Sequence, residues 1–166
     1  MTRDVKTKPV TRRPMKWMDD APIRVTQSRH ITASADAVFA VLADHEAWPQ
    51  WFGALSAVEI TGEPAGVGAE RRVFIPGLGA IDEEFLVWEP GEAFGFSVIG
   101  MQRRIFVSLN ELITIEPSGE GVLVTYTQAF DPKLWIALWW HIAARTTLPR
   151  ALRKGLAGLA NRVEAD

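Results

Sequence analysis

A single carboxylate interrupts an otherwise apolar alternation in the second half of the chain. Between Ile105 and Ile115 every second residue is apolar except Glu111. Because alternate residues of a strand point to the same face, this pattern predicts that the Glu111 side chain lies on the buried face. A buried carboxylate needs a cationic or hydroxyl partner, or else its pKa rises. A β-bulge at Asn110 would reverse the alternation and place this carboxylate in solvent, which is the open alternative.

Three residues have the right chemistry to pair with that carboxylate, namely Arg72, His141 and Tyr126. Tyr126 belongs to a second alternating run, at 122–130, in which Tyr126 and Gln128 are the polar members. If this run is a strand, both side chains share a face with its apolar residues. Tyr126 and Gln128 are therefore the expected inward polar groups.

The remaining residues that could do chemistry form no motif. The histidines at 30, 45 and 141 are far apart and have no ordered carboxylate spacing, so no metal site is predicted. Gly66-Val67-Gly68 lacks the third glycine and the following helix of a dinucleotide-binding loop, and it is interpreted as a turn. No Gly-x-Ser-x-Gly elbow occurs, and the absence of cysteine excludes disulfides and thiolate chemistry. We expect no cofactor.

Strands must position these side chains, and Gly- and Pro-bearing turns mark their ends. The first expected strand is 23–31, where β-branched and polar residues alternate. The connections between later strands are short, which makes neighbours antiparallel. Six further strands are expected at 56–63, 69–75, 79–89, 93–99, 104–116 and 122–130.

Helical spacing of apolar residues appears after the first strand and at the C-terminus. Ser34 is the expected N-cap of one short helix, and 47–52 is expected to form another. The segment 133–163 carries apolar residues at helical spacing and predicts one long helix. Pro149 is expected to kink it.

Four local sequences occur in an order typical of a known family: ITASADAVFAVLAD at 31–44, WPQW at 48–51, GVGAERR at 66–72 and VWEPGE at 87–92. Together with the order of elements, they resemble the START-like, or SRPBCC, superfamily, in its polyketide cyclase/dehydrase-type branch. The resemblance covers about residues 23–164. It implies an α+β helix-grip fold, with a seven-stranded curved antiparallel sheet around a long C-terminal helix and two short helices between the first two strands. It implies no single reaction, because the superfamily holds both enzymes and binding proteins.

A sheet wrapped around one helix leaves an apolar cavity with a few polar groups. The favoured function is binding, transport or sensing of a hydrophobic small molecule such as a lipid, isoprenoid or polyketide. The alternative is a polyketide cyclase or aromatase that uses Glu111 or His141 as acid/base and Tyr126 to steady an oxyanion. The expected ligand-binding residues are Glu111, Tyr126, Gln128, Arg72 and His141 for polar contacts, and Trp51, Phe74, Phe85 and Phe96 for the apolar wall.

Charge divides the chain into two parts. Residues 1–21 carry six Lys or Arg against three Asp and are expected to form a flexible basic arm, followed by a START-like ligand-binding domain at 22–166. That domain carries twelve basic against seventeen acidic residues, which argues against nucleic acid as a partner. No secretory signal is visible and the most apolar segment, 134–144, is too short to span a bilayer, so a cytoplasmic protein without a transmembrane segment is expected.

Trp135 and Trp139 lie four residues apart on one stripe of the C-terminal helix, and other apolar residues form a second stripe. Both stripes cannot face one core. Trp135, Trp139 and Trp140 therefore either form an exposed patch that contacts a second subunit or a membrane surface, or fold over the cavity mouth, or pack on the N-terminal arm. A homodimer is slightly favoured, and a protein-interaction module built on this helix is the third functional class.

Overall fold

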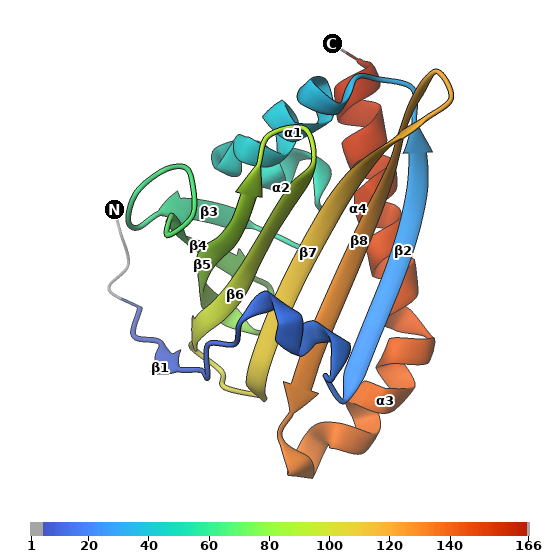
Figure 1. The fold of residues 1–166 in the computed structure, drawn as a ribbon. Coiled ribbons are helices and arrows are strands. Elements are labelled where there is room, and N and C mark those ends of the chain that lie inside the picture. The colour runs from blue at the N-terminus through green and yellow to red at the C-terminus, as the bar shows by residue number, and fades with distance from the viewer. Residues whose placement is uncertain (1–4, 166) are drawn as a thin grey trace.

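In the computed structural model, short turns connect strands that pair antiparallel in one curved sheet (Figure 1). The structure describes residues 5–165. The sheet order is β2-β8-β7-β6-β5-β4-β3, and β1 pairs with β6. The seven strands expected from the sequence are all present, and the N-terminal segment adds β1 as an eighth. The strands are β1 Lys8–Pro9, β2 Ile23–Ile31, β3 Ala57–Ile60, β4 Glu70–Ile75, β5 Gly79–Glu89, β6 Ala93–Met101, β7 Phe106–Ser118 and β8 Gly121–Pro132.

Two short helices follow β2, as expected, and the C-terminal helices cover the concave face of the sheet (Figure 1). Ser34 caps α1, because its Oγ accepts a hydrogen bond from the amide of Ala37. The helices are η1 Met15–Asp19, α1 Ala35–Ala43, η2 His45–Ala47, α2 Trp48–Trp51, η3 Leu134–Ile136, α3 Ala137–Arg145 and α4 Thr147–Glu164.

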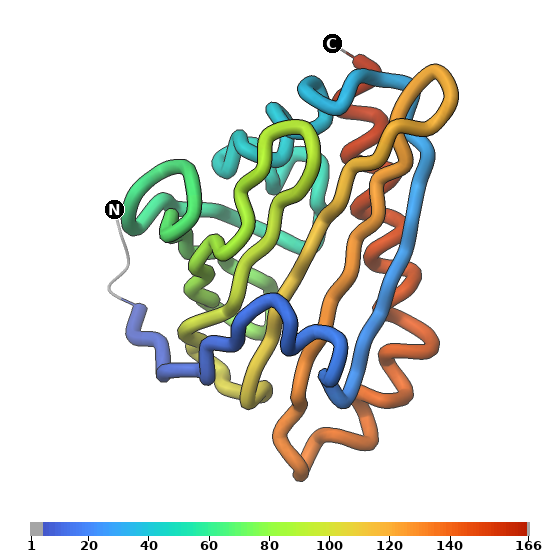
Figure 2. Tube along the Cα trace, in the orientation of Figure 1, coloured from blue at the N-terminus to red at the C-terminus, as the bar shows by residue number. Residues whose placement is uncertain are grey.

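The C-terminal helix is broken rather than kinked, which corrects the expectation of one continuous helix over 133–163. α3 ends at Arg145, and α4 begins at Thr147. Pro149 lies in the first turn of α4. In a continuous helix its ring would clash with the carbonyl group of Arg145, so the break lies before the proline and not at it. Figure 2 shows the chain changing direction there.

The strand that carries Glu111 keeps a regular register around this residue. β7 pairs with β8 without interruption from Ser108 to Ser118, so no bulge lies at Asn110. The register shift lies at Val107 instead. As a result Val107, expected on the buried face, is 37% exposed, whereas its neighbour Phe106 is buried.

The N-terminal segment at 5–21 is packed on the sheet, in contrast to the flexible arm expected from the sequence. Residues 5–21 run across the convex face of the sheet, in front of β6, β7 and β8 in Figure 1. Val10 and Met18 are buried there. Residues 1–4 of the expected arm lie outside the described part of the chain.

Polar side chains on the convex face explain why this segment docks. Ser97, Ser108 and Asn110 are all fully buried beneath it. Asn110 donates hydrogen bonds to the carbonyl oxygens of Arg13 and Pro14, at 3.0 and 3.3 Å. The Arg13 amide donates to Ser97 and its guanidinium to Ser108. Buried polar groups require such partners, and the segment supplies them for Ser97, Ser108 and the side-chain amide nitrogen of Asn110.

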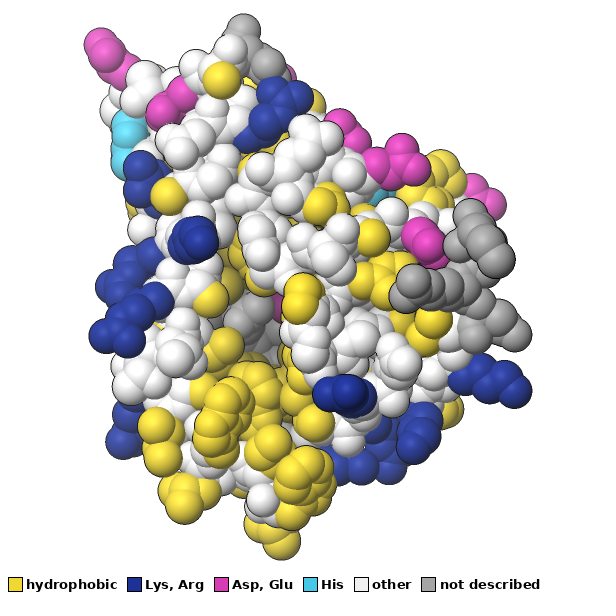
Figure 3. Space-filling model, turned by 180° about the vertical axis from the view of Figure 1, so that it is seen from behind, with side chains coloured by type: hydrophobic (Ala, Val, Ile, Leu, Met, Phe, Trp, Pro, Cys, Tyr) yellow, Lys and Arg dark blue, Asp and Glu magenta, His cyan; other side chains and the backbone are white. Residues whose placement is uncertain are grey.

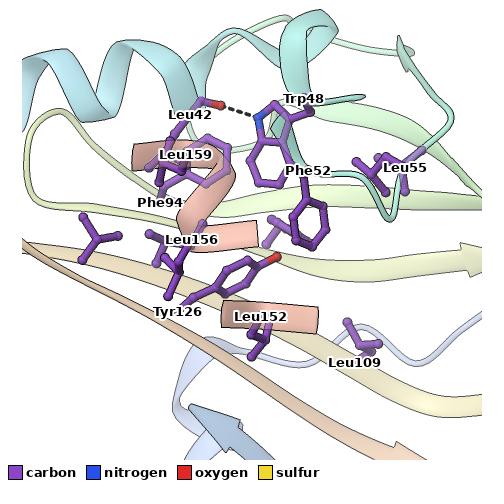
Figure 4. Packing of buried hydrophobic residues seen from close by; sticks show 14 of the residues in the cluster. Leu42, Trp48, Phe52, Leu55, Phe94, Leu109, Tyr126, Leu152, Leu156 and Leu159 are labelled. Atoms are coloured by element: carbon purple, nitrogen blue, oxygen red, sulfur yellow. Dashed lines mark hydrogen bonds between the residues drawn. The ribbon is translucent and has the colours of Figure 1, made fainter. Parts of the chain in front are cut away.

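The core lies between the concave face and α4 (Figure 4). Leu152, Leu156 and Leu159 of α4 are buried against the sheet beside Tyr126. Trp48 anchors α2, because its indole N–H donates to the carbonyl oxygen of Leu42 at 2.8 Å.

Two glycines let α4 approach α2 closely. A Cβ at Gly155 would meet the ring of Phe52, and a Cβ at Gly158 would meet the carbonyl oxygen of Trp51. Neither position has room for a larger side chain.

Candidate functional site

A cavity of about 200 Å³ lies between the concave face of the sheet and the C-terminal helices. Most of the side chains that line it are apolar, and they come from the strands, from α2 and from α3 and α4. Ala54 and Ala151 line the cavity and are also exposed, so it opens between the loop after α2 and the first turns of α4. Figure 3 shows a hollow on this side of the molecule.

Three polar side chains of β7 and β8 meet at the cavity. Glu111 pairs with Gln128 across the two strands, so the two side chains share one face. Gln128 Nε2 donates to Glu111 Oε1 at 3.0 Å, and the Tyr126 hydroxyl donates to Glu111 Oε2. Each oxygen of this carboxylate thus accepts one hydrogen bond, and all three residues line the cavity.

The pKa of Glu111 is raised from 4.5 to about 7, first by burial and then by the negative charge of Glu83. The hydrogen bonds from Tyr126 and Gln128 and the positive charge of Arg71 act in the opposite direction. Burial, and then the charge of Glu111, also raise the pKa of the Tyr126 hydroxyl well above its ordinary value. Near neutral pH, Glu111 therefore exists in both protonation states while Tyr126 remains a donor.

A buried ion pair forms a second polar group of the cavity. Arg71 Nε donates to Glu83 Oε2 at 2.6 Å, both side chains are buried, and both line the cavity. The guanidinium carbon of Arg71 lies 4.1 Å from the ring centre of Trp48, a cation–π contact. Burial raises the pKa of Glu83, and the charge of Arg71 opposes this shift.

His45 completes the surroundings of the ion pair. Arg71 Nη1 lies 3.3 Å from His45 Nδ1, and because a guanidinium has donors only, Nδ1 is the acceptor. Burial, followed by the positive charge of Arg71, lowers the pKa of His45 to about 4. The imidazole is therefore neutral at physiological pH and stabilises the orientation of Arg71.

The structure brings four of the residues expected from the sequence together at the cavity: Glu111, Tyr126, Gln128 and Phe96. Two others are core residues outside the lining. Phe85 packs on Phe96 with ring centres 5.4 Å apart, and Trp51 packs on Trp48 with ring centres 4.6 Å apart.

Three expected site residues lie away from the cavity. Arg72 follows Arg71 on a strand, so it points to the opposite face, where it donates to Asp82 at 2.6 Å. Phe74 shares that face and is half-buried. His141 is exposed on α3, whereas the preceding residue, Trp140, is buried and lines the cavity.

Sequence reasoning missed Arg71 and Glu83, although a usable signal existed for Glu83. In β5 the residues Ile81, Glu83 and Phe85 alternate with polar neighbours, which is the pattern that identified Glu111. The register pairs Arg71 directly with Glu83, so locating the carboxylate would have located its partner.

Among residues 5–165, no group of three or more His, Asp or Glu side chains could hold a metal ion. None of the helices in that range is both long and apolar enough to cross a membrane.

Several known proteins share this architecture. A di-domain aromatase/cyclase, StfQ, from the steffimycin biosynthetic pathway superposes with a TM-score of 0.75 at 12% identity, over 90% of this chain and 54% of that one. Norcoclaurine synthase of Thalictrum flavum, solved with dopamine and hydroxybenzaldehyde, superposes with a TM-score of 0.67 at 18% identity, over 96% of this chain and 97% of the other. At these identities the likeness shows the fold alone.

Similarity in sequence, unlike the shared fold, identifies the family of this chain. The uncharacterized protein Rv2574 of Mycobacterium tuberculosis is 30% identical over 122 residues, which are 73% of each chain. The family model described as polyketide cyclase/dehydrase and lipid transport matches residues 22–164. The chain therefore belongs to the polyketide cyclase/dehydrase and lipid transport family, which confirms the resemblance seen in its local sequences.

Proposed function

We propose that the chain binds a small, largely apolar molecule that carries an oxygen-containing polar end. The observation that carries this proposal is the Glu111 carboxylate, which lies in a cavity whose walls are otherwise mainly apolar. A ligand hydroxyl group could donate to the ionised carboxylate, and a ligand carbonyl group could accept from the protonated form. The apolar walls would contribute most of the affinity, and the polar group would orient the ligand.

An unpaired hydrogen-bond donor on a residue that lines the cavity supports the same class of ligand. The indole N–H of Trp140 is buried and has no hydrogen-bond partner among residues 5–165, and this side chain lines the cavity. An unpaired buried donor is costly, and an acceptor on the ligand would satisfy it.

The size of the cavity limits the ligand further. At about 200 Å³ it holds roughly seven water-sized groups of about 30 Å³ each, which suits one or two fused rings. A longer molecule would extend through the opening between Ala54 and Ala151. Dopamine and hydroxybenzaldehyde, found in norcoclaurine synthase, are oxygenated single-ring molecules of this size class.

Titration with 2-naphthol and naphthalene tests the proposal, because the two probes differ by one hydroxyl group. We expect 2-naphthol to bind about tenfold tighter to the parent protein, since a hydrogen bond to a charged group is worth about 1.5–3 kcal/mol. Glu111→Leu should abolish that preference, and Glu116→Gln, at an exposed position of the same strand, should keep it. Equal affinities for the two probes, or no binding of either, would refute the proposal. Native mass spectrometry of protein from its own host would identify the natural ligand.

A cyclase-type activity is the second candidate, and the pKa of Glu111 favours it. A carboxylate that titrates near pH 7 can remove a proton next to a carbonyl group. Once Glu111 holds that proton, the Tyr126 hydroxyl, which donates to the ionised carboxylate, can turn to donate to the enolate oxygen. Hydrogen–deuterium exchange next to the carbonyl group of 1-tetralone would measure this step. Acceleration by the parent protein that is lost in Glu111→Gln is the expected result. Equal exchange with both proteins would leave binding as the function.

A further inference from the structure

The outer face of α3 and of the turn before it carries a cluster of exposed apolar side chains. We define the α3 patch as Leu134, Trp135, Leu138, Trp139 and Ile142, whose exposed fractions range from 56% for Trp139 and Ile142 to 93% for Leu134. In Figure 3 hydrophobic side chains gather at the lower end of the molecule, below the hollow. Soluble proteins seldom leave such a cluster without a partner.

The same helix connects the patch to the cavity. Trp140, on the inner face of α3, lines the cavity, and its ring centre lies 4.7 Å from that of Trp139 in the patch. Leu148 and Ala151, at the start of α4, also line the cavity, and Ala151 is exposed at its opening. Whatever covers the α3 patch therefore lies beside the cavity opening.

Charge around the patch identifies the kind of partner. The chain as a whole is acidic, with a formal charge of −2, yet no Asp or Glu occurs between Pro132 and Val163. Figure 3 shows Lys and Arg side chains on both sides of the hydrophobic cluster. The cations next to the patch in sequence are Lys133, Arg145, Arg150, Arg153 and Lys154.

This charge pattern argues against a second copy of the chain. A symmetric dimer through the patch would bring the same cations of two subunits close together without any acid from this segment to neutralise them. An anionic lipid surface would instead attract the cations, and Trp and Leu side chains insert readily at the level of the headgroups.

We propose that the α3 patch binds anionic lipid bilayers peripherally and places the cavity opening at the membrane surface. Trp135 and Trp139 insert among the headgroups, and the flanking cations contact lipid phosphates. A ligand would then enter the cavity from the bilayer, and only this route rests on the proposed function.

Sedimentation with lipid vesicles tests the docking. The parent protein should bind vesicles of phosphatidylcholine with about 30 mol % phosphatidylglycerol at least tenfold better than vesicles of phosphatidylcholine alone, and added salt should weaken this binding. The double variant W135A/W139A should lose about tenfold or more of the binding, because both side chains are more than half exposed and are the ones that insert among the headgroups. Val67→Ala, at an exposed apolar position outside the patch, is the matched control.

Two results would overturn the proposal. One is equal binding of parent and W135A/W139A to the anionic vesicles, or no binding at all. The other is a dimer, seen by light scattering, that W135A/W139A converts to a monomer, since the patch would then be a subunit interface. Titration with 2-naphthol distinguishes failure of the docking proposal from failure of the proposed function. W135A/W139A should bind this probe as tightly as the parent does, whether or not it binds vesicles.

Discussion

Replacing Glu111 by Gln removes a group whose pKa changes on folding while it keeps the shape of the side chain. The amide oxygen can still accept from Gln128, and the amide nitrogen can donate to the Tyr126 oxygen. The comparison of Glu111→Gln with the parent therefore isolates the titration of the carboxylate.

The size and sign of the effect follow from the pKa values. The pKa of Glu111 rises from 4.5 in the unfolded chain to about 7 in the folded protein. At 1.36 kcal/mol per pKa unit, this difference corresponds to about 3 kcal/mol. Between these two values the unfolded chain binds fewer protons than the folded one, so the free energy of unfolding of the parent falls as the pH rises. Below this window the residue contributes nothing, and above it the full penalty applies.

Urea unfolding followed by tryptophan fluorescence, at several values between about pH 4.5 and pH 8, measures the difference. Relative to the parent, Glu111→Gln should gain about 3 kcal/mol of stability across this range, because groups that titrate alike in both proteins cancel. Glu116→Gln, which is exposed on the same strand, should show no such gain. A difference between Glu111→Gln and parent that does not change with pH, or that changes in the opposite direction, would refute the assignment of a raised pKa.

Three further variants test the packing of the site and of the fold by chemical unfolding. Arg71→Met leaves the Glu83 carboxylate buried without its ion-pair partner and should destabilise the protein by about 3–5 kcal/mol. The double variant, Arg71→Met with Glu83→Leu, should recover most of this loss because no unpaired charge remains. If the double variant is no more stable than Arg71→Met alone, the pairing is contradicted. Gly158→Ala should cost about 1–3 kcal/mol because its Cβ meets a carbonyl oxygen of α2, while Gly53→Ala, where a Cβ meets nothing, should cost clearly less. Asn110→Ala removes two hydrogen bonds to the N-terminal segment and should lower the free energy of unfolding by about 1–3 kcal/mol. It should also speed amide hydrogen exchange in residues 5–21. Unchanged exchange there would mean that other contacts hold the segment.

Local signals explain why the sheet was predictable from the sequence. The turns at Pro76-Gly77 and Glu89-Pro90-Gly91 bound one strand, and the structure places β5 at the expected residues, Gly79–Glu89. The clear alternation of apolar residues on either side of Glu111 predicts that its side chain lies on the buried face. Such patterns depend only on residues close together in the chain, so they can be recognised in a single sequence.

Where apolar residues fall on both faces of a strand or helix, the sequence does not indicate which face is buried, and the prediction of the residue that faces the cavity was wrong. In β4 the run Val73, Phe74 and Ile75 has no clear alternation, so Arg72 was expected at the site and Arg71 lies there. On α3 a rotation by one residue about the helix axis exchanges Trp140 and His141, and it is Trp140 that faces the cavity.

The docking of the N-terminal segment on the sheet could not be predicted for a different reason. Residues 5–21 show no period of their own, because they pair with a surface that is distant in sequence. The polar residues of that surface, such as Ser97 and Asn110, look like solvent-facing residues until a covering segment is known.

The order of strands in the sheet has a consequence for protein synthesis. β2 precedes the other long strands of the described chain, yet its neighbour is β8, and Ile23 pairs with Phe130. The N-terminal segment likewise waits for β6 and β7 before it can dock. Until β8 has been synthesised, therefore, the apolar side chains of β2 have no strand to pair with, and this exposure favours aggregation of the nascent chain.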